Sequence, residues 1–199
     1  MPHKVAAALG VVALGLVAGC RTLPPVATPA AVPWEQRRPL LQARDHFELK
    51  GRVAIAVADQ GVNANLQWTQ AGERTQVTLE GPLGVGAVRI SAAGAELVIV
   101  NADGQRVDSD AAHAELAARL GFDPPLHSLR YWIQGVPDPA TVATETLEPG
   151  QERLQALTQD GWSILYTSYT LVGNEWLPAR LTVKRESVRV RLLIDGWRL

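Results

Sequence analysis

The sequence predicts a mainly β protein whose curved antiparallel sheet forms an incomplete β-barrel of about 10–11 strands. Short runs of alternating apolar and polar residues recur at a spacing of about ten residues along most of the chain. Hydrophobic residues make up 47% of the 199 positions, enough for one domain with a sizeable core. A sheet this long must curl and its inner face needs cover, so we expect about three short helices over a hydrophobic cavity.

The N-terminus has the features of an export signal. Lys4 precedes an apolar run from Val5 to Ala18, which is shorter than the roughly 20 residues that a membrane-spanning helix needs. The run ends in Val17-Ala18-Gly19-Cys20, which resembles the lipobox of bacterial lipoproteins. We therefore expect residues 1–19 to be a lipoprotein signal peptide and Cys20 to be the lipid attachment site. The alternative is that this single cysteine, which has no disulfide partner within the chain, is unmodified.

Residues 20–33 are predicted to form a proline-rich tether behind this lipid-modified cysteine. Prolines at positions 24, 25, 29 and 33 favour an extended segment, which reaches roughly 40 Å at about 3.1 Å per residue. Bacterial lipoproteins carry more than one acyl chain, which anchors them firmly. An aspartate after the cysteine retains such proteins in the inner membrane, and Arg21 occupies that position here. We expect a lipid-anchored protein of the outer membrane that faces the periplasm.

Residues 34–199 are predicted to form a single domain that begins with a helix. The segment from Trp34 to Arg44 is partly helical, with Trp34, Leu41 and the pair Arg37/Arg38 on different faces, and Pro39 starts or kinks the helix. An antiparallel meander with one apolar face should follow, with strands at residues 53–58, 62–68, 77–79, 88–90, 97–100 and 106–107.

Two helices interrupt this meander. Asp108 or Ser109 can cap the first, which runs to about Leu120. The second spans residues 126–134, and its apolar stripe consists of Leu129, Trp132 and Ile133. Strands then resume at residues 141–147, 153–158, 162–169, 177–184 and 188–194. The helices can close the mouth of a half-open barrel over an apolar cavity, although the pattern alone favours a fully packed core.

The residue types that carry chemistry show no catalytic pattern. The histidines at positions 46, 113 and 127 do not stand in metal-ligand spacing, and no G-x-S-x-G motif surrounds Ser128. The glycine-rich segment at residues 81–86 lacks the Lys-Ser/Thr of a phosphate loop. A net charge of −1 provides no basic field for nucleic acid. We expect a protein that is not an enzyme, has no catalytic residue, metal or cofactor, and binds no nucleic acid.

The segment Gly81-Pro82-Leu83-Gly84 has the features of a functional loop. Pro82 presets a turn and Gly84 permits positive φ, which places Leu83 at a hairpin tip with few neighbours to pack against. Leu83 can fold back onto the sheet, or it can act as a hydrophobic probe that touches a membrane or a lipid.

Several motifs resemble the family of the outer-membrane lipoprotein LolB. The most specific is Leu129-Arg130-Tyr131-Trp132-Ile133-Gln134-Gly135-Val136-Pro137. The others are Phe47-Glu48-Leu49-Lys50-Gly51-Arg52-Val53, Trp68, Gly81-Pro82-Leu83-Gly84, and Trp162 with Tyr166 and Tyr169. Their order and spacing match the family from Trp34 to Gly196-Trp197, and the lipobox adds to the resemblance.

The resemblance implies a fold, a function and partners. The family fold is an incomplete antiparallel β-barrel with helices in its opening, which favours the cavity over the packed core. The implied function is that of a receptor that accepts lipoproteins from the periplasmic carrier LolA and inserts them into the inner leaflet of the outer membrane. Its partners are then LolA, the acyl chains of cargo lipoproteins and the outer-membrane bilayer. Leu83, with Pro82 and Gly84, matches the protruding loop that the family inserts into the membrane.

We expect a monomer whose acyl cavity is lined by Val53, Leu66, Trp68, Trp132 and Ile133, although ordinary core packing explains each of these residues as well. The last strands are basic, through Arg180, Lys184, Arg185, Arg189 and Arg191. These cations can steer the carrier or form a solvated outer face.

Two other classes of function fit parts of the sequence. A non-catalytic scaffold subunit of an outer-membrane assembly complex would use exposed strand edges to bind protein. A periplasmic lipid hydrolase would need a nucleophile motif, and the sequence has none.

Overall fold

The structure is a computed structural model, and it describes residues 32–58, 60–81 and 86–199. Its helices are α1 (Trp34–Gln42), α2 (Ser109–Leu120) and α3 (Leu126–Trp132). Its strands are β1 (His46–Val57), β2 (Gln60–Ala71), β3 (Arg74–Glu80), β4 (Val88–Ala93), β5 (Glu96–Val100), β6 (Arg106–Asp108), β7 (Ala143–Leu147), β8 (Leu154–Gln159), β9 (Trp162–Val172), β10 (Glu175–Arg185) and β11 (Val188–Arg198).

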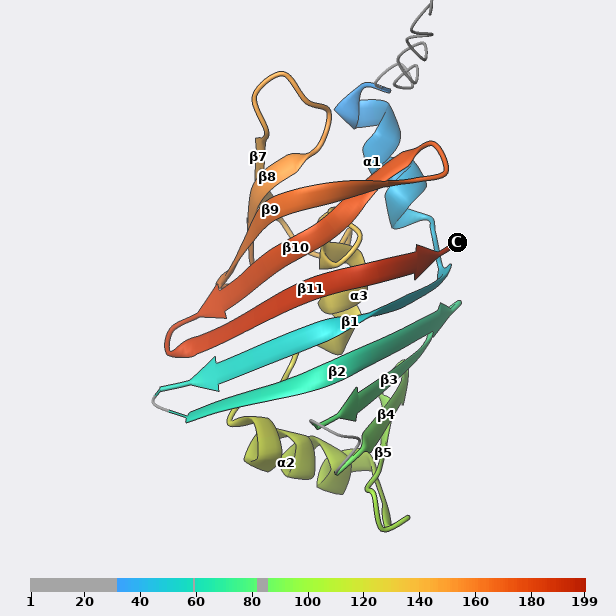
Figure 1. The fold of residues 1–199 in the computed structure, drawn as a ribbon, viewed down its shortest axis with the longest axis vertical. Coiled ribbons are helices and arrows are strands. Elements are labelled where there is room, and N and C mark those ends of the chain that lie inside the picture. The colour runs from blue at the N-terminus through green and yellow to red at the C-terminus, as the bar shows by residue number, and fades with distance from the viewer. Residues whose placement is uncertain (1–31, 59, 82–85) are drawn as a thin grey trace, which may run out of the picture.

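All the strands belong to one antiparallel sheet of eleven, in the order β6-β5-β4-β3-β2-β1-β11-β10-β9-β8-β7. The two edge strands, β6 and β7, do not pair with each other, so the barrel stays open. The sheet curls around α3, with α2 across one end and α1 beside the other (Figure 1). This confirms the predicted incomplete barrel with short helices in its opening.

Alternation along the strands decides which side chains enter the interior. Along β1, Leu49 and Val53 are buried, while Lys50 and Arg52 are exposed. The pairs Val53 with Leu192 and Leu49 with Trp68 join β1 to its neighbours on both sides. The buried core therefore continues from β2 across β1 to β11, the last strand of the chain.

Helix α1 contains Pro39 in its interior, so the helix does not start there. Trp34, Arg37 and Leu41 share its buried face, whereas the sequence placed the arginine on a different face. The reason is a set of partners distant in sequence. Arg37 Nε donates to Glu175 at 2.5 Å, and its guanidinium also donates to the carbonyl oxygens of Glu152 and Trp176. A buried guanidinium with this many acceptors is compatible with a core position.

Most of the other elements lie where the alternation predicts, but their first and last residues differ from the predicted ones. Helix α3 ends at Trp132, two residues earlier than predicted, and β9 continues to Val172. Asp108 occupies the N-cap position of α2, but its carboxylate makes no capping hydrogen bond. Val62 continues the inner face of β2, yet it is 56% exposed, because it lies in the walls of two recesses beneath α2.

Candidate functional site

An apolar cavity of about 70 Å³ lies between the inner face of the sheet and the segment that joins α2 to α3. Every side chain around it is aliphatic, aromatic or proline. The sheet contributes Val53, Ile55, Trp68, Val77, Leu79, Ile90, Trp162, Val183, Val190 and Leu192. The helices and their connection contribute Leu120, Phe122, Pro124, Pro125, Leu126, Leu129 and Ile133. Such a site binds apolar groups and offers no partner to a polar one.

The predicted lining residues divide into two groups. Val53, Trp68 and Ile133 lie on the cavity wall. Leu66 and Trp132 are buried, at 4% and 0% exposure, but belong to the surrounding core and do not line the cavity. The sequence analysis did not identify Phe122, which lies in the connection between α2 and α3, where no helical or strand periodicity marks an inward-facing residue.

Two open recesses continue from this cavity beneath α2. One, of about 370 Å³, includes Val62, Ala64, Leu116, Gly81 and Gly86 in its wall. The other, of about 410 Å³, lies between α2 and the ends of β1 and β2. Ile55 and Leu120 border both recesses and the apolar cavity. The C-terminal end of α2 therefore lies where the small apolar cavity meets the two larger recesses.

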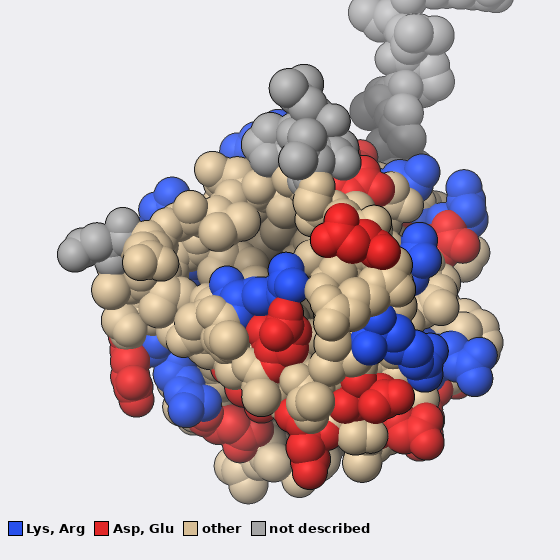
Figure 2. All heavy atoms as spheres, turned by 90° about the horizontal axis from the view of Figure 1, so that it is seen from below, with Lys and Arg blue, Asp and Glu red and all other residues tan. Residues whose placement is uncertain are grey.

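Figure 2 shows this end of the molecule, where uncharged side chains surround a recess and charged ones lie beside it. Arg119 borders the recesses, and its guanidinium donates a hydrogen bond to the carboxylate of Glu115 on the same helix at 2.6 Å.

The predicted insertion residues Pro82, Leu83 and Gly84 lie outside the described residues, as does Cys20. Gly81 and Gly86, the described residues on either side of that loop, lie in the wall of the recess.

Helix α3 is fixed by buried hydrogen bonds. Gln159 accepts from Trp132 Nε1 at 2.8 Å and from the backbone N–H of Asp138 at 2.9 Å. The hydroxyl of Tyr166 donates to the carbonyl oxygen of Trp132 at 2.9 Å. Burial raises the pKa of Tyr166 well above its ordinary value, so the hydroxyl keeps the proton that it donates. These bonds explain why Trp132 faces a polar network rather than the cavity.

The turn after α3 explains the glycine of the most specific motif. Gly135 has a φ of +81°, which disfavours side chains. A Cβ at this position would lie 3.1 Å from the Pro178 ring and 3.3 Å from the Tyr169 hydroxyl. The turn therefore holds the end of α3 tightly against β9 and β10.

Helix α2 is held differently. Ala112 and Leu116 are its buried residues, and it ends at Gly121, which has a φ of +78°. Within the described part of the chain, its side chains form no hydrogen bond or ion pair with the sheet or with α3. Besides a 3.5 Å contact between His113 and Asp123 of the connection to α3, its packing is apolar, so α2 has fewer polar attachments than α3.

The polar groups near α3 gather around the buried carboxylate of Asp138. The Ser128 hydroxyl donates to the buried Asp138 carboxylate at 2.8 Å, and His127 Nε2 lies 3.6 Å from the same carboxylate. Across residues 32–58, 60–81 and 86–199, acidic, histidine and cysteine side chains do not gather in groups of three that could hold a metal ion. None of the helices in these ranges has the length and apolar character needed to cross a bilayer.

Comparison with known proteins decides the family. The family model described as "Outer membrane lipoprotein LolB" matches residues 45–197. The chain belongs to the LolB family. Outer-membrane lipoprotein LolB of Pseudomonas putida is 32% identical over 164 residues, which cover 82% of this chain and 80% of that protein. LolB of Nitrosococcus oceani is 32% identical over 187 residues, or 92% of each chain.

Solved structures share the fold of this LolB-family chain at low identity. A LolA superfamily protein from Nitrosomonas europaea aligns with a TM-score of 0.54 at 11% identity, covering 85% of this chain and 94% of the other. A putative outer membrane lipoprotein-sorting protein domain from Vibrio parahaemolyticus aligns with a TM-score of 0.51 at 9% identity, covering 83% and 90%. The open, curled sheet is therefore common to this LolB-family chain and to LolA-type proteins.

The buried network gives a prediction for stability. Replacement of Gln159 by leucine leaves the indole N–H of Trp132 and the backbone N–H of Asp138 without acceptors. We expect the free energy of unfolding, measured in urea, to fall by about 2–4 kcal/mol. Gln155→Leu makes the same change at an exposed position of β8 and should leave it nearly unchanged. Equal effects of the two variants would contradict the role of the network.

Proposed function

We propose that this chain is a lipid-anchored receptor of the outer membrane that accepts lipoproteins from the periplasmic carrier LolA and inserts them into the inner leaflet. Membership of the LolB family and the fold shared with LolA-type proteins support an outer-membrane role in lipoprotein localisation. The observation that carries the finer proposal is the apolar cavity, whose walls continue into the open recesses under α2.

The cavity must enlarge to hold an acyl chain. Its volume of about 70 Å³ is below the roughly 150 Å³ of a cavity that admits benzene. The recesses on the other side of Leu120 are several times larger, so movement of α2 away from β1 would join them to the cavity. Helix α3 stays in place, because its hydrogen bonds to β8 and β9 are buried. The acyl chain thus enters beneath α2 and packs against α3 and the sheet.

Transfer of the acyl chains needs only a difference in affinity between the carrier and this protein. Acyl chains are costly to expose to water, so they pass directly from the carrier to the apolar cavity. Each 1.4 kcal/mol by which this cavity binds them more tightly favours transfer tenfold. No bond is made or broken in the cargo, and the side chains around the cavity include no nucleophile, acid or base. The protein therefore acts as a receptor and not as an enzyme, with Val53, Trp68 and Ile133 among the contacts of the acyl chain.

Membrane attachment is part of the same proposal. Cleavage after residue 19 and acylation of Cys20 would leave residues 20–33 as a tether of roughly 40 Å. The domain would then face the periplasm and remain within reach of both the carrier and the bilayer.

The direct test is to mix the purified protein with a carrier–lipoprotein complex and separate the components. We expect the cargo to migrate with this protein, because the cavity binds its acyl chains. A non-catalytic scaffold subunit, the competing function, would leave all of the cargo on the carrier. Retention of the cargo by the carrier would therefore contradict the proposed function.

The loop residue Leu83 gives a second prediction. Leu83→Glu should leave acceptance of lipoproteins from the carrier unchanged and slow their delivery to vesicles by roughly tenfold or more, because a carboxylate enters the bilayer poorly. Delivery is measured as the cargo recovered with floated vesicles over time. Leu40→Glu, on the exposed face of α1, is the matched control and should deliver at the normal rate. Equal delivery by both variants would contradict the insertion role of the loop.

A further inference from the structure

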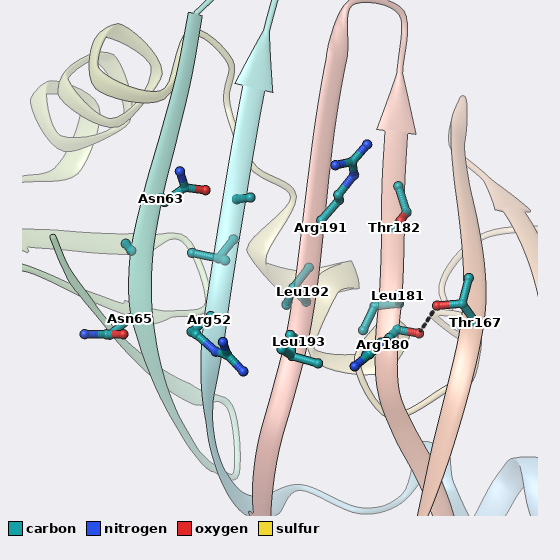
Figure 3. Close-up of a pocket in the computed structure, with 13 residues that line it drawn as sticks. Arg52, Asn63, Asn65, Thr167, Arg180, Leu181, Thr182, Arg191, Leu192 and Leu193 are labelled. Carbon is teal, nitrogen blue, oxygen red and sulfur yellow. Dashed lines mark hydrogen bonds between the residues drawn. The ribbon is translucent and has the colours of Figure 1, made fainter. Parts of the chain in front are cut away.

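A second hollow, of about 540 Å³, lies on the outer face of the sheet, the face that α2 and α3 do not cover. It extends across β2, β1, β11 and β10, and its rim consists of Arg52, Asn63, Asn65, Arg180, Thr182 and Arg191 (Figure 3). In contrast to the apolar cavity, this rim offers many hydrogen-bond donors. It faces away from the cavity, because strand alternation points these side chains outward.

Strand register explains the arrangement of the hollow. Leu193 on β11 pairs with Arg52 on one side and with Arg180 on the other. Figure 3 shows Leu193 between the two arginines. In the next row, Arg191 pairs with Ala54 and Thr182. Ala54, beside Arg191, has a small side chain and lines the hollow with both rows.

The charges around the hollow are not balanced. Arg52 forms an ion pair with Asp195 at 2.9 Å. Among the described residues, Arg180 and Arg191 form no ion pair, and neither do Lys184 and Arg189 next to them on the same two strands. Lys184 pairs with Arg189 in the register, so like charges lie side by side. Such a cluster of like charges is destabilising unless an anion binds to it. Guanidinium groups bind phosphate oxygens through bidentate hydrogen bonds.

We propose that this hollow docks the domain on anionic phospholipid headgroups, with lipid phosphates held by Arg180 and Arg191. The proposal rests on the membrane attachment proposed above, because a tether of roughly 40 Å keeps headgroups at high local concentration. Docking through the outer face leaves the recesses under α2 accessible from the opposite side of the sheet. The receptor can therefore remain on the bilayer while it accepts cargo.

The test uses the lipid-modified protein in vesicles of phosphatidylcholine, with or without phosphatidylglycerol. A fluorophore on Ser163→Cys, which is exposed on the outer face beside Lys184, reports contact with headgroups that carry a nitroxide quencher. We expect quenching on the anionic vesicles alone, and weaker quenching at high salt. Each cation near an anionic surface contributes roughly fivefold to the binding, so Arg180→Glu with Arg191→Glu should reduce the docked population at least tenfold.

Three controls separate the possible causes. Arg180→Lys with Arg191→Lys keeps the charge but loses the bidentate hydrogen bonds. It should lower docking less than Arg180→Glu with Arg191→Glu does. Arg89→Glu with Arg106→Glu makes the same change in net charge on β4 and β6, away from the hollow, and should leave docking unchanged. A fluorophore on Ala111→Cys, exposed on α2, should not be quenched.

The outcomes are distinguishable. If the protein floats with the vesicles but the Ser163→Cys fluorophore is never quenched, this inference fails and the anchoring proposal stands. If the protein floats with neither kind of vesicle, both fail. Unchanged docking in the double glutamate variant would also overturn the inference. If that variant instead loses affinity for the carrier, the hollow binds an acidic protein surface.

Discussion

With Val57 and Gly121 both replaced by cysteine, the oxidised protein should accept no lipoprotein from the carrier, and the reduced protein should accept it. A Cβ built on Gly121 lies 3.3 Å from the Cβ of Val57, close to the roughly 3.5–4.5 Å that a disulfide joins. The bond would hold the C-terminal end of α2 on β1 and keep the cavity at its volume of about 70 Å³. Acceptance is measured as the cargo that migrates with the protein before and after addition of dithiothreitol.

The single variant Gly121→Cys is the matched control for this cross-link. It carries the same strain of a side chain at positive φ, about 1 kcal/mol or more, but cannot form the bond. The only native cysteine is Cys20, at the proposed lipid attachment site, so no second pairing is expected in the lipid-modified protein. Normal acceptance by the oxidised double variant would show that acyl chains enter without movement of α2.

The largest effect on stability is expected from Gly51→Ala. Strand β1 changes register against β11 between Lys50 and Gly51, and the two backbones come close together there. A Cβ on Gly51 would lie 2.2 Å from the carbonyl oxygen of Leu193, and a backbone atom cannot move aside as a side chain can. We expect the free energy of unfolding, measured in urea, to fall by about 3 kcal/mol or more, or the protein not to fold.

Gly61→Ala is the control for this substitution. Gly61 lies on β2, and a Cβ there meets only the carbonyl oxygen of Ile55, at an ordinary 3.7 Å. Its free energy of unfolding should stay within about 1 kcal/mol of the parent. Equal stability of the two variants would contradict the explanation that close backbone contact requires glycine at position 51.

The fold could be predicted from the sequence because its main determinant is local. A period of two puts Val53 and Trp68 on one face and Arg52 on the other, whatever lies further along the chain. The stripe of α3 likewise brings Ile133 to the cavity. The same local pattern could not place Arg37, whose acceptors on Glu152 and Glu175 lie more than a hundred residues away in sequence.

The candidate site was only partly predictable for the same reason. Trp132 belongs to the apolar stripe, but its indole N–H finds an acceptor in Gln159, and this contact turns the ring away from the cavity. Leu66 lies on the inner face, as the alternation predicts, but it packs in the core and does not line the cavity. The volume of the cavity depends on the distance between the helices and the sheet. A pattern of residues does not specify this distance.

The attachment of α1 determines where a mechanical load enters the domain. In an anchored protein, thermal motion of the bilayer pulls on the chain just before Trp34. The backbone N–H of Trp34 is bonded to Glu152 at 2.6 Å, its indole N–H to Glu145 at 2.7 Å, and Arg37 to Glu175. The tension therefore passes into β7, β10 and the loop before β8 before it reaches β1. Strand β1, which borders both the cavity and its recesses, would receive this tension last, so the cavity would keep its shape under load.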